Sequence, residues 1–156
     1  MQTDIWGPSA WKFLHMTVHN YPIQPTIEDK NAYSSLFATL KTTLPCCYCT
    51  KSFTLFYDNI HITQFLETRI GLIAWLYCIH NFVNLKLGKK IMDLKDALAE
   101  YEQYRVDKNE IVKHTDNLFN KYFDIMREEL NTFIKYNMDK EEIKLILNTF
   151  NKKNIE

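Results

Sequence analysis

The sequence predicts an all-α protein, a four-helix bundle with a short fifth helix and a C-terminal helical extension. Hydrophobic residues make up 46% of the 156 residues, so the chain can bury a sizeable core. Only 3 glycines and 4 prolines are present, too few for a β-sandwich with many tight turns or for a glycine-rich phosphate loop. Apolar residues recur three and four positions apart in almost every segment, which is the period of an amphipathic helix.

Apolar stripes and proline boundaries define the first two predicted helices. The first begins near Pro8 and ends near Tyr21, because Pro22 disfavours helical geometry in the residue before it. The second runs from about Glu28 to Thr43, after a loop in which Thr26 is a candidate N-cap. The stripes consist of Trp11, Leu14, His15 and Val18 in the first helix and Tyr33, Leu36, Phe37 and Leu40 in the second.

Pro45 begins a new helix, because proline suits the first turn, where its missing N–H is not needed. This third helix is predicted over Cys46 to Tyr57 and places a cysteine cluster at its N-terminus. Residues 59–65 form a connection that can run on into a long fourth helix, which Gly88 terminates. A short fifth helix is predicted from about Leu94 to Tyr104.

A domain boundary is expected at residues 106–109, where the polar run VDKN interrupts the helical pattern. Residues 1–105 would then form the functional domain, and residues 106–156 a helical extension with amphipathic helices over 110–136 and 139–152. The apolar stripes of the extension must be buried somewhere, so we expect it to mediate association.

The charge balance and the hydropathy pattern exclude several classes of partner. Nineteen Lys and Arg balance nineteen Asp and Glu, and no basic block stands out, so we expect no nucleic-acid partner. No apolar run approaches the roughly 18 residues of a membrane-spanning helix. No signal peptide is visible at the N-terminus. These patterns predict a soluble, cytoplasmic protein without a membrane partner.

The C-x-x-C formed by Cys46 and Cys49 predicts a redox-active pair. At the start of a helix the two cysteines can form a disulfide, and the helix dipole lowers the pKa of the first thiol. The alternative is a zinc-stabilised helical interaction module with Cys78 and His80 as further ligands, although residues two apart point about 200° apart on a helix. A third interpretation is ordinary buried cysteines. Cys47 points about 100° away from its neighbours and is expected to be a passive thiol.

A stripe of aromatic, histidine and asparagine side chains is the second candidate site. Trp11 and His15 are one helical turn apart, as are His80 and Asn84, and Trp75 lies just over one turn before His80. Polar side chains on otherwise apolar faces are costly to bury unpaired. A planar heteroaromatic ligand with many acceptors would pair them, and a tryptophan could stack on it. The amides and lysines that follow His80 suit ribityl hydroxyls and a pyrophosphate.

Four blocks of the chain resemble the Erv/ALR family of FAD-linked sulfhydryl oxidases. Their order and spacing agree with the family, and the resemblance covers roughly residues 5–105. The combination of W-x-x-L-H, C-x-x-C and H-N-x-V-N in this order is the most specific part. The blocks are WGPSAWKFLH (6–15), YPIQPT (21–26), LPCCYC (44–49) and WLYCIHNFVNLKLGK (75–89).

The resemblance implies a helical bundle that holds FAD with its isoalloxazine ring next to the C-x-x-C. It implies that the enzyme oxidises thiols of protein substrates and passes the electrons to O2, which yields H2O2. Cys46 would exchange with the incoming dithiol, and Cys49 would lie against the flavin. The positions that match the family's cofactor-binding residues are Gly7, Trp11, His15, Cys49, His80, Asn81, Val83, Asn84, Lys86, Lys89 and Tyr101.

The chain departs from the family pattern in three places. Tyr77 and Leu94 occupy positions where many members carry a structural disulfide, and Cys78 is one position away from the first. There is no second C-x-x-C to act as an internal shuttle, and the C-terminal extension is unlike the short family core. The chain therefore resembles the short members encoded by large DNA viruses. This resemblance implies a separate thioredoxin-like shuttle or direct thiol substrates, a homodimer, and a location in the host cytoplasm or virion.

Overall fold

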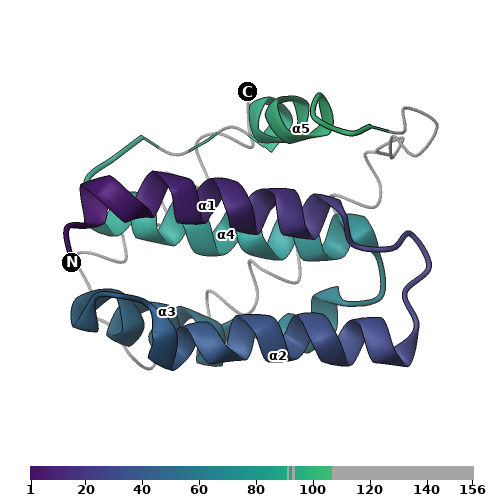
Figure 1. The fold of residues 1–156 in the computed structure, drawn as a ribbon, viewed down its shortest axis with the longest axis horizontal. Helices are drawn as coiled ribbons and strands as arrows, with labels where there is room; N and C mark the ends of the chain where they lie inside the picture. Colours follow the sequence, from purple (N-terminus) through teal and green to yellow (C-terminus); the bar gives the residue numbers. More distant parts are fainter. Residues whose placement is uncertain (91, 93, 107–156) are drawn as a thin grey trace, which may run out of the picture.

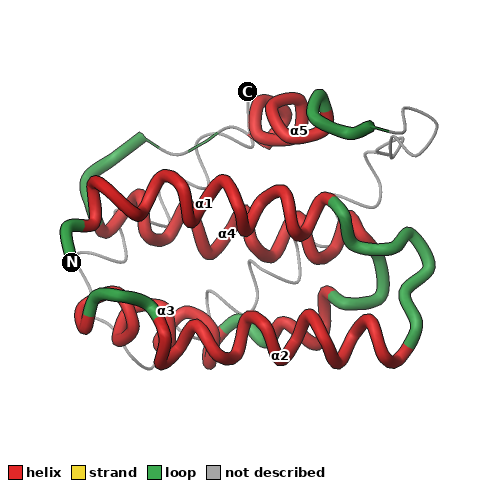
Figure 2. Tube along the Cα trace, viewed as in Figure 1, coloured by secondary structure: helices red, strands yellow, loops and turns green. Residues whose placement is uncertain are grey.

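The computed structural model describes residues 1–90, 92 and 94–106, and within these residues every regular element is helical. The predicted all-α fold is thereby confirmed (Figure 2). The two predicted helices of the extension lie outside the described residues. The elements are α1 (Thr3–His19), α2 (Ile27–Thr43), α3 (Cys47–Asn59), a 3-10 turn η1 (Ile62–Phe65), α4 (Arg69–Lys86) and α5 (Leu94–Glu102).

The helices form two packed pairs with α5 laid against one of them (Figure 1). Helix α1 packs along α4, α2 packs along α3, and α3 also contacts α4. Helix α5 contacts α1 on the side away from α2. The first turn of α3 and the last turn of α4 lie at the same end of the bundle in Figure 1. This end brings the C-x-x-C close to the amide- and lysine-bearing segment.

Local capping explains where the helices begin and end. Thr26 accepts a hydrogen bond from the backbone N–H of Asp29, whose carboxylate accepts one from the N–H of Thr26, so a capping box begins α2. Cys46 is the N-cap of α3, which therefore begins one residue later than predicted. Gly88 has a φ of +66°, a left-handed conformation that favours glycine, and it follows the end of α4 as predicted.

Helix α4 forms the centre of the core. All its residues from Ile70 to Ile79 are buried, and Trp75 is fully buried between edge-on contacts with Phe37 and Tyr57. The indole N–H of Trp75 donates a 2.9 Å hydrogen bond to the carbonyl oxygen of Ile60. Trp75 is thus a core residue with a satisfied polar atom, and its side chain packs away from the polar stripe with which the sequence grouped it.

Other predicted boundaries also differ from the structure. Helix α1 begins at Thr3, and Pro8 lies inside it rather than at its start. Residues 66–68 separate η1 from α4, so the connection does not run on into the fourth helix. Helix α5 ends at Glu102, before Tyr104. Each difference is a matter of one to a few residues at a helix end, where backbone groups are paired by local contacts that periodicity does not report.

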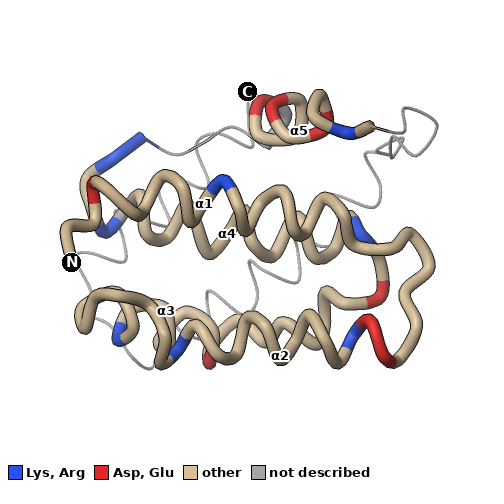
Figure 3. Tube along the Cα trace, viewed as in Figure 1, with Lys and Arg blue, Asp and Glu red and all other residues tan. Residues whose placement is uncertain are grey.

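The charged residues of the described region are spread over several helices (Figure 3). Acidic residues on α5 include Asp96, Glu100 and Glu102, and the last of these is buried. Among the described residues, none of the helices is long and apolar enough to cross a membrane.

Candidate active site

Cys46 and Cys49 are joined as a disulfide at the N-terminus of α3. Their Cα atoms are 5.1 Å apart, which is within the ordinary range for a disulfide. The backbone N–H of Cys49 donates to Sγ of Cys46 at 3.3 Å. Because the N-terminal end of a helix stabilises negative charge, a thiolate released at Cys46 would be stabilised by this N–H and by the helix dipole.

The two other cysteines are free and lie in contrasting environments. Cys47 is exposed on the first turn of α3, and Cys78 of α4 is buried in the core of the protein. Burial raises the pKa of the Cys78 thiol well above its ordinary value, which keeps it protonated and unreactive. Among the described residues no group of three or more His, Cys, Asp or Glu side chains is arranged to hold a metal ion. The zinc alternative therefore gains no support from this part of the chain.

Four of the predicted cofactor-binding residues come together in one ring cluster, which consists of Trp11, His15, His80 and Tyr101. The indole of Trp11 stacks on the imidazole of His80, with ring centroids 3.9 Å apart and an interplanar angle of 7°. Nε2 of His15 lies 2.9 Å from Nδ1 of His80, and the His15 ring stacks on Tyr101 at 4.6 Å. Helices α1, α4 and α5 each contribute to this cluster, which the C-x-x-C helix α3 does not enter.

Burial keeps the histidines of the ring cluster uncharged. It lowers the pKa of His15 to about 3, with the nearby His80 and His19 adding to the effect, and it lowers the pKa of His80 to about 4, with Lys89 adding. Burial likewise raises the pKa of Tyr101 to about 12. At neutral pH one imidazole therefore donates the hydrogen bond between the two histidines and the other accepts it.

The asparagines of H-N-x-V-N link α4 to the segment before α5. Oδ1 of Asn81 accepts the backbone N–H of Met92 at 2.9 Å, and Nδ2 of Asn81 donates to the carbonyl oxygen of Met92 at 3.2 Å. The hydroxyl of Tyr77 donates to the same carbonyl at 2.6 Å, and Nδ2 of Asn84 donates to Oδ1 of Asn81 at 3.4 Å. We call Tyr77, Asn81 and the backbone of Met92 the Met92 clasp. Asn81 is fully buried in this clasp.

The remaining predicted positions lie around the last turn of α4 and the first of α1. The Lys86 ammonium donates to the hydroxyl of Ser52, one turn after Cys49, which links the end of α4 to the disulfide-bearing helix. The backbone N–H of Lys89 donates to the carbonyl oxygen of Asn84 at 2.8 Å. Val83 is partly buried against the core, and no atom lies within 4 Å of a Cβ built on Gly7, which leaves space beside the backbone there.

Comparison with known proteins decides between the redox and zinc interpretations. The model of the Erv1/Alr family matches residues 8–105. This chain belongs to the Erv1/Alr family. The match includes the ring cluster, the Cys46–Cys49 disulfide and the Met92 clasp, so the expected resemblance is confirmed over the predicted functional domain.

Viral and cellular proteins are among the relatives. A probable FAD-linked sulfhydryl oxidase of Acanthamoeba polyphaga mimivirus is 34% identical over 104 residues, which cover 66% of this chain and 73% of that protein. A putative FAD-linked sulfhydryl oxidase of Invertebrate iridescent virus 6 is 32% identical over 93 residues, covering 56% of this chain and 84% of the relative. The solved FAD-binding domain of Erv1 from Saccharomyces cerevisiae is 28% identical, covers 66% of this chain and 96% of that domain, and superposes with a TM-score of 0.63.

The described residues offer FAD, the cofactor of this family, suitable partners. Nε1 of Trp6, next to Gly7, is buried with no hydrogen-bond partner among the described residues, and a bound group rich in acceptors would satisfy such a donor. The stacked rings of Trp11 and His80 and the lysine in the last turn of α4 are of the kinds that a flavin nucleotide could contact. The chemistry of these residues therefore fits FAD.

Sequence reasoning missed one group of buried polar residues next to the ring cluster. His19 is not among the predicted site residues, and the structure shows it buried and hydrogen-bonded to Glu102 of α5. The signal was available in part, because His19 lies one turn after His15 on the same helix. Its partners Glu102 and Arg105 could not be identified from spacing, since they are more than eighty positions away.

Proposed function

We propose that this member of the Erv1/Alr family is an FAD-dependent thiol oxidase that introduces disulfides into protein substrates. The observation that carries the proposal is the Cys46–Cys49 disulfide at the N-terminus of α3, on the helix that contacts the His80- and Lys86-bearing α4. Bound FAD would take two electrons from the reduced cysteine pair and pass them to O2, which yields H2O2.

The cysteine chemistry proceeds by thiol–disulfide exchange. A substrate thiolate attacks Sγ of Cys46, a new sulfur–sulfur bond forms, and the bond to Cys49 breaks with release of the Cys49 thiolate. A second substrate thiolate then attacks the substrate sulfur of this mixed disulfide and releases Cys46 as a thiolate. The substrate leaves as a disulfide, and two electrons remain on the cysteine pair, with Cys49 as the residue that faces the cofactor.

The proposed cofactor site consists of the ring cluster and the residues near the end of α4. We propose that the rings of Trp11, His15, His80 and Tyr101 contact FAD, with Gly7 leaving room for close approach. Asn84, Lys86, Lys89 and Val83 would line the ribityl and pyrophosphate portion. Asn81 is engaged by the backbone of Met92, so its contribution would be to hold this segment in place.

Partners and location are proposals as well. Substrates would be thiol-containing proteins or a separate thioredoxin-like shuttle, acting in the host cytoplasm or the virion. We further propose a homodimer, with residues 106–156 contributing to association. An exposed apolar stripe on α1 supports a second copy of the chain as partner, because Ile5, Phe13 and Met16 share the helix face opposite the core.

Cysteine variants test the mechanism. Cys46→Ser and Cys49→Ser should each abolish oxidation of a dithiol, measured as O2 consumption, because neither variant can form the disulfide. Both should keep the yellow cofactor, with flavin absorbance at about 450 nm. Cys47→Ser and Cys78→Ser are the matched controls and should retain most activity, because neither thiol belongs to the disulfide.

Two results would contradict this function. Near-wild-type turnover in Cys46→Ser or Cys49→Ser would exclude the proposed exchange pathway. A colourless purified protein that carries stoichiometric zinc would favour the zinc-stabilised interaction module instead.

A further inference from the structure

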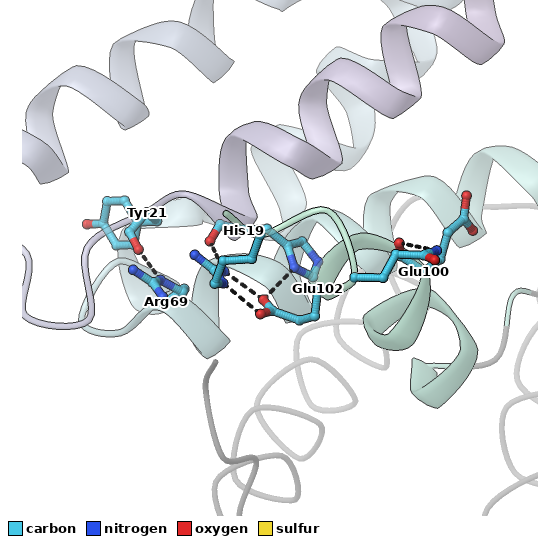
Figure 4. Close-up of polar contacts among 7 residues, drawn as sticks. His19, Tyr21, Arg69, Glu100 and Glu102 are labelled. Carbon is cyan, nitrogen blue, oxygen red and sulfur yellow. Dashed lines mark hydrogen bonds and ion pairs between the residues drawn. The ribbon is translucent and has the colours of Figure 1, made fainter. Parts of the chain in front are cut away.

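A buried network of charged and polar groups joins the end of α1 to the end of α5. Nδ1 of His19 lies 2.8 Å from Oε1 of Glu102, and the two side chains point toward one another in Figure 4. Nε of Arg105 donates to Oε2 of Glu102 at 2.8 Å, and Nη2 donates to Oε1 at 2.7 Å. Nη2 also donates to the carbonyl oxygen of His19 at 2.5 Å. The three side chains are between 6% and 10% exposed.

The network lies next to the ring cluster, one residue away on α5 and one helical turn away on α1. Tyr101 directly precedes Glu102, and its ring stacks on His15 at 4.6 Å with an interplanar angle of 8°. His15 lies one helical turn before His19, whose ring also lies 5.5 Å from Tyr101. One turn of α1 is therefore paired with the last turn of α5, through a ring contact at one level and a charged contact at the next.

Helix α5 depends on tertiary contacts to stay in this register. It is short, and helices below roughly 12–15 residues are marginal unless tertiary contacts hold them. Among the residues of α5 whose side chains the structure describes, Ala97, Leu98, Tyr101 and Glu102 are buried. The Met92 clasp holds the segment before the helix, and the Glu102 network holds the end of the helix.

We infer that His19, Glu102 and Arg105 are positioning residues for the cofactor site, which hold Tyr101 against His15 so that this wall of the ring cluster is formed before FAD binds. The inference rests on the proposed function, because it requires that Tyr101 contributes to FAD binding. If the Tyr101 side chain is already ordered in the free protein, FAD binding does not lose the free energy needed to order it.

The electrostatics of Glu102 agree with such a role. Burial alone would raise the pKa of this carboxyl, but hydrogen bonds from Arg105 and His19, with their charges, lower it below the ordinary value, so the carboxylate is ionised. A buried ion pair adds little stability compared with apolar packing, but removal of one partner leaves the other without compensation. The geometry at Glu102 is thus sensitive to loss of its charge.

The test measures FAD affinity in Glu102→Gln, with Glu67→Gln as the matched control. Glu67 forms an exposed ion pair with Lys30, so the control removes the same charge away from the site. FAD is titrated into protein freed of cofactor, and binding is followed by flavin fluorescence. We expect the dissociation constant to rise at least about tenfold in Glu102→Gln, as for other mutations that remove a group orienting a ligand-binding residue, and to stay unchanged in the control.

A double-mutant cycle separates positioning from general stabilisation. If Glu102 acts through Tyr101, then Glu102→Gln should weaken FAD binding little further once Tyr101→Ala is present. Effects on the dissociation constant that simply multiply would overturn the inference. Histidine variants provide a second route if Glu102→Gln folds poorly. His19→Asn keeps a donor near Nδ1 and should retain FAD affinity, whereas His19→Leu should lose it.

The outcomes also distinguish this inference from the proposed function. Wild-type protein that binds no FAD would overturn both. Wild-type protein that binds FAD, together with Glu102→Gln or His19→Leu of unchanged affinity, would overturn the positioning role alone and leave the oxidase function intact.

Discussion

At the scale of single residues, the site selects the neutral form of two histidines. His15 and His80 share one hydrogen bond between Nε2 and Nδ1, and each ring is also stacked on an aromatic neighbour, Tyr101 and Trp11 respectively. Two imidazolium ions could not share this bond, because both nitrogens would then be donors. Burial disfavours protonation of either ring, with His80 and His19 adding to the effect at His15 and Lys89 adding to it at His80, which is the reason for their low pKa values.

This arrangement predicts a loss of stability in acid. The pKa falls from 6.5 to about 3 at His15 and to about 4 at His80, so between pH 6.5 and about 4 the unfolded chain binds more protons. Above this window the two neutral histidines do not reduce the free energy of unfolding. The free energy should decrease as the pH falls through the window, by roughly 1–2 kcal/mol for each histidine at about pH 5. Urea denaturation near pH 7 and at about pH 5 measures the change.

An exposed histidine supplies the control for the acid prediction. His80→Gln should reduce the pH dependence of the unfolding free energy, and His61→Gln, at an exposed position, should leave it as in the wild type. Equal pH dependence in all three proteins would mean that His80 does not stay neutral in the folded state.

At the scale of elements, the end of α4 determines where the predicted phosphate-binding lysine lies. Gly88 adopts a φ of +66°, and the following N–H of Lys89 donates back to the carbonyl oxygen of Asn84 at 2.8 Å, which is the pattern of a Schellman cap. The cap turns the chain toward Met92, whose backbone is hydrogen-bonded by Tyr77 and Asn81. Hydrogen bonds thus hold this segment in a chain that has tyrosine where many family members have cysteine.

Substitution of Gly88 tests this cap. Gly88→Ala should lower the free energy of unfolding by about 1 kcal/mol, because a positive φ is energetically unfavourable for alanine. No atom lies within 4 Å of a Cβ built there, so the loss would come from the backbone and not from a clash. FAD affinity should fall as well, since Lys89 follows directly. Gly88→Asn is the matched variant and should lose less, because asparagine tolerates this conformation. Equal losses for both variants would contradict the argument.

At the scale of the whole molecule, the family match over residues 8–105 ends at the residue where the Glu102 network closes. Arg105 contacts both Glu102 and the carbonyl of His19, so it belongs to the bundle. The proposed boundary between residues 1–105 and 106–156 accordingly falls directly after Arg105, whose contacts hold the end of α5 against α1.

A shortened variant that ends after Val106 tests this boundary. It should bind FAD and oxidise a small dithiol at a rate close to that of the full chain, because it retains the disulfide, the ring cluster and the Glu102 network. Its oligomeric state, measured by size-exclusion chromatography with light scattering, should differ from that of the full chain. A folded but flavin-free variant would place residues 107–156 in the cofactor-binding domain.

Local patterns determined much of this protein in advance. Helical periodicity predicted the five helices of the described region, because each must bury one apolar face. The i, i+4 pairs on α1 and α4 grouped Trp11, His15 and His80 in one candidate site, and Pro45 with the C-x-x-C indicated that a disulfide can form at a helix start. These features depend on residues close in sequence, whose relative placement the helix itself fixes.

Other features were decided only by how the helices pack. The contact of His19 with Glu102 spans 83 positions, and no spacing rule relates two residues on different helices. Trp75 and His80 lie close together on α4, yet packing against Phe37 places the tryptophan in the core while the histidine meets Trp11. Helix periodicity fixes which residues share a face, but the neighbouring helices decide what that face contacts. Tertiary packing therefore determines which polar side chains are paired inside the protein and which remain for the cofactor.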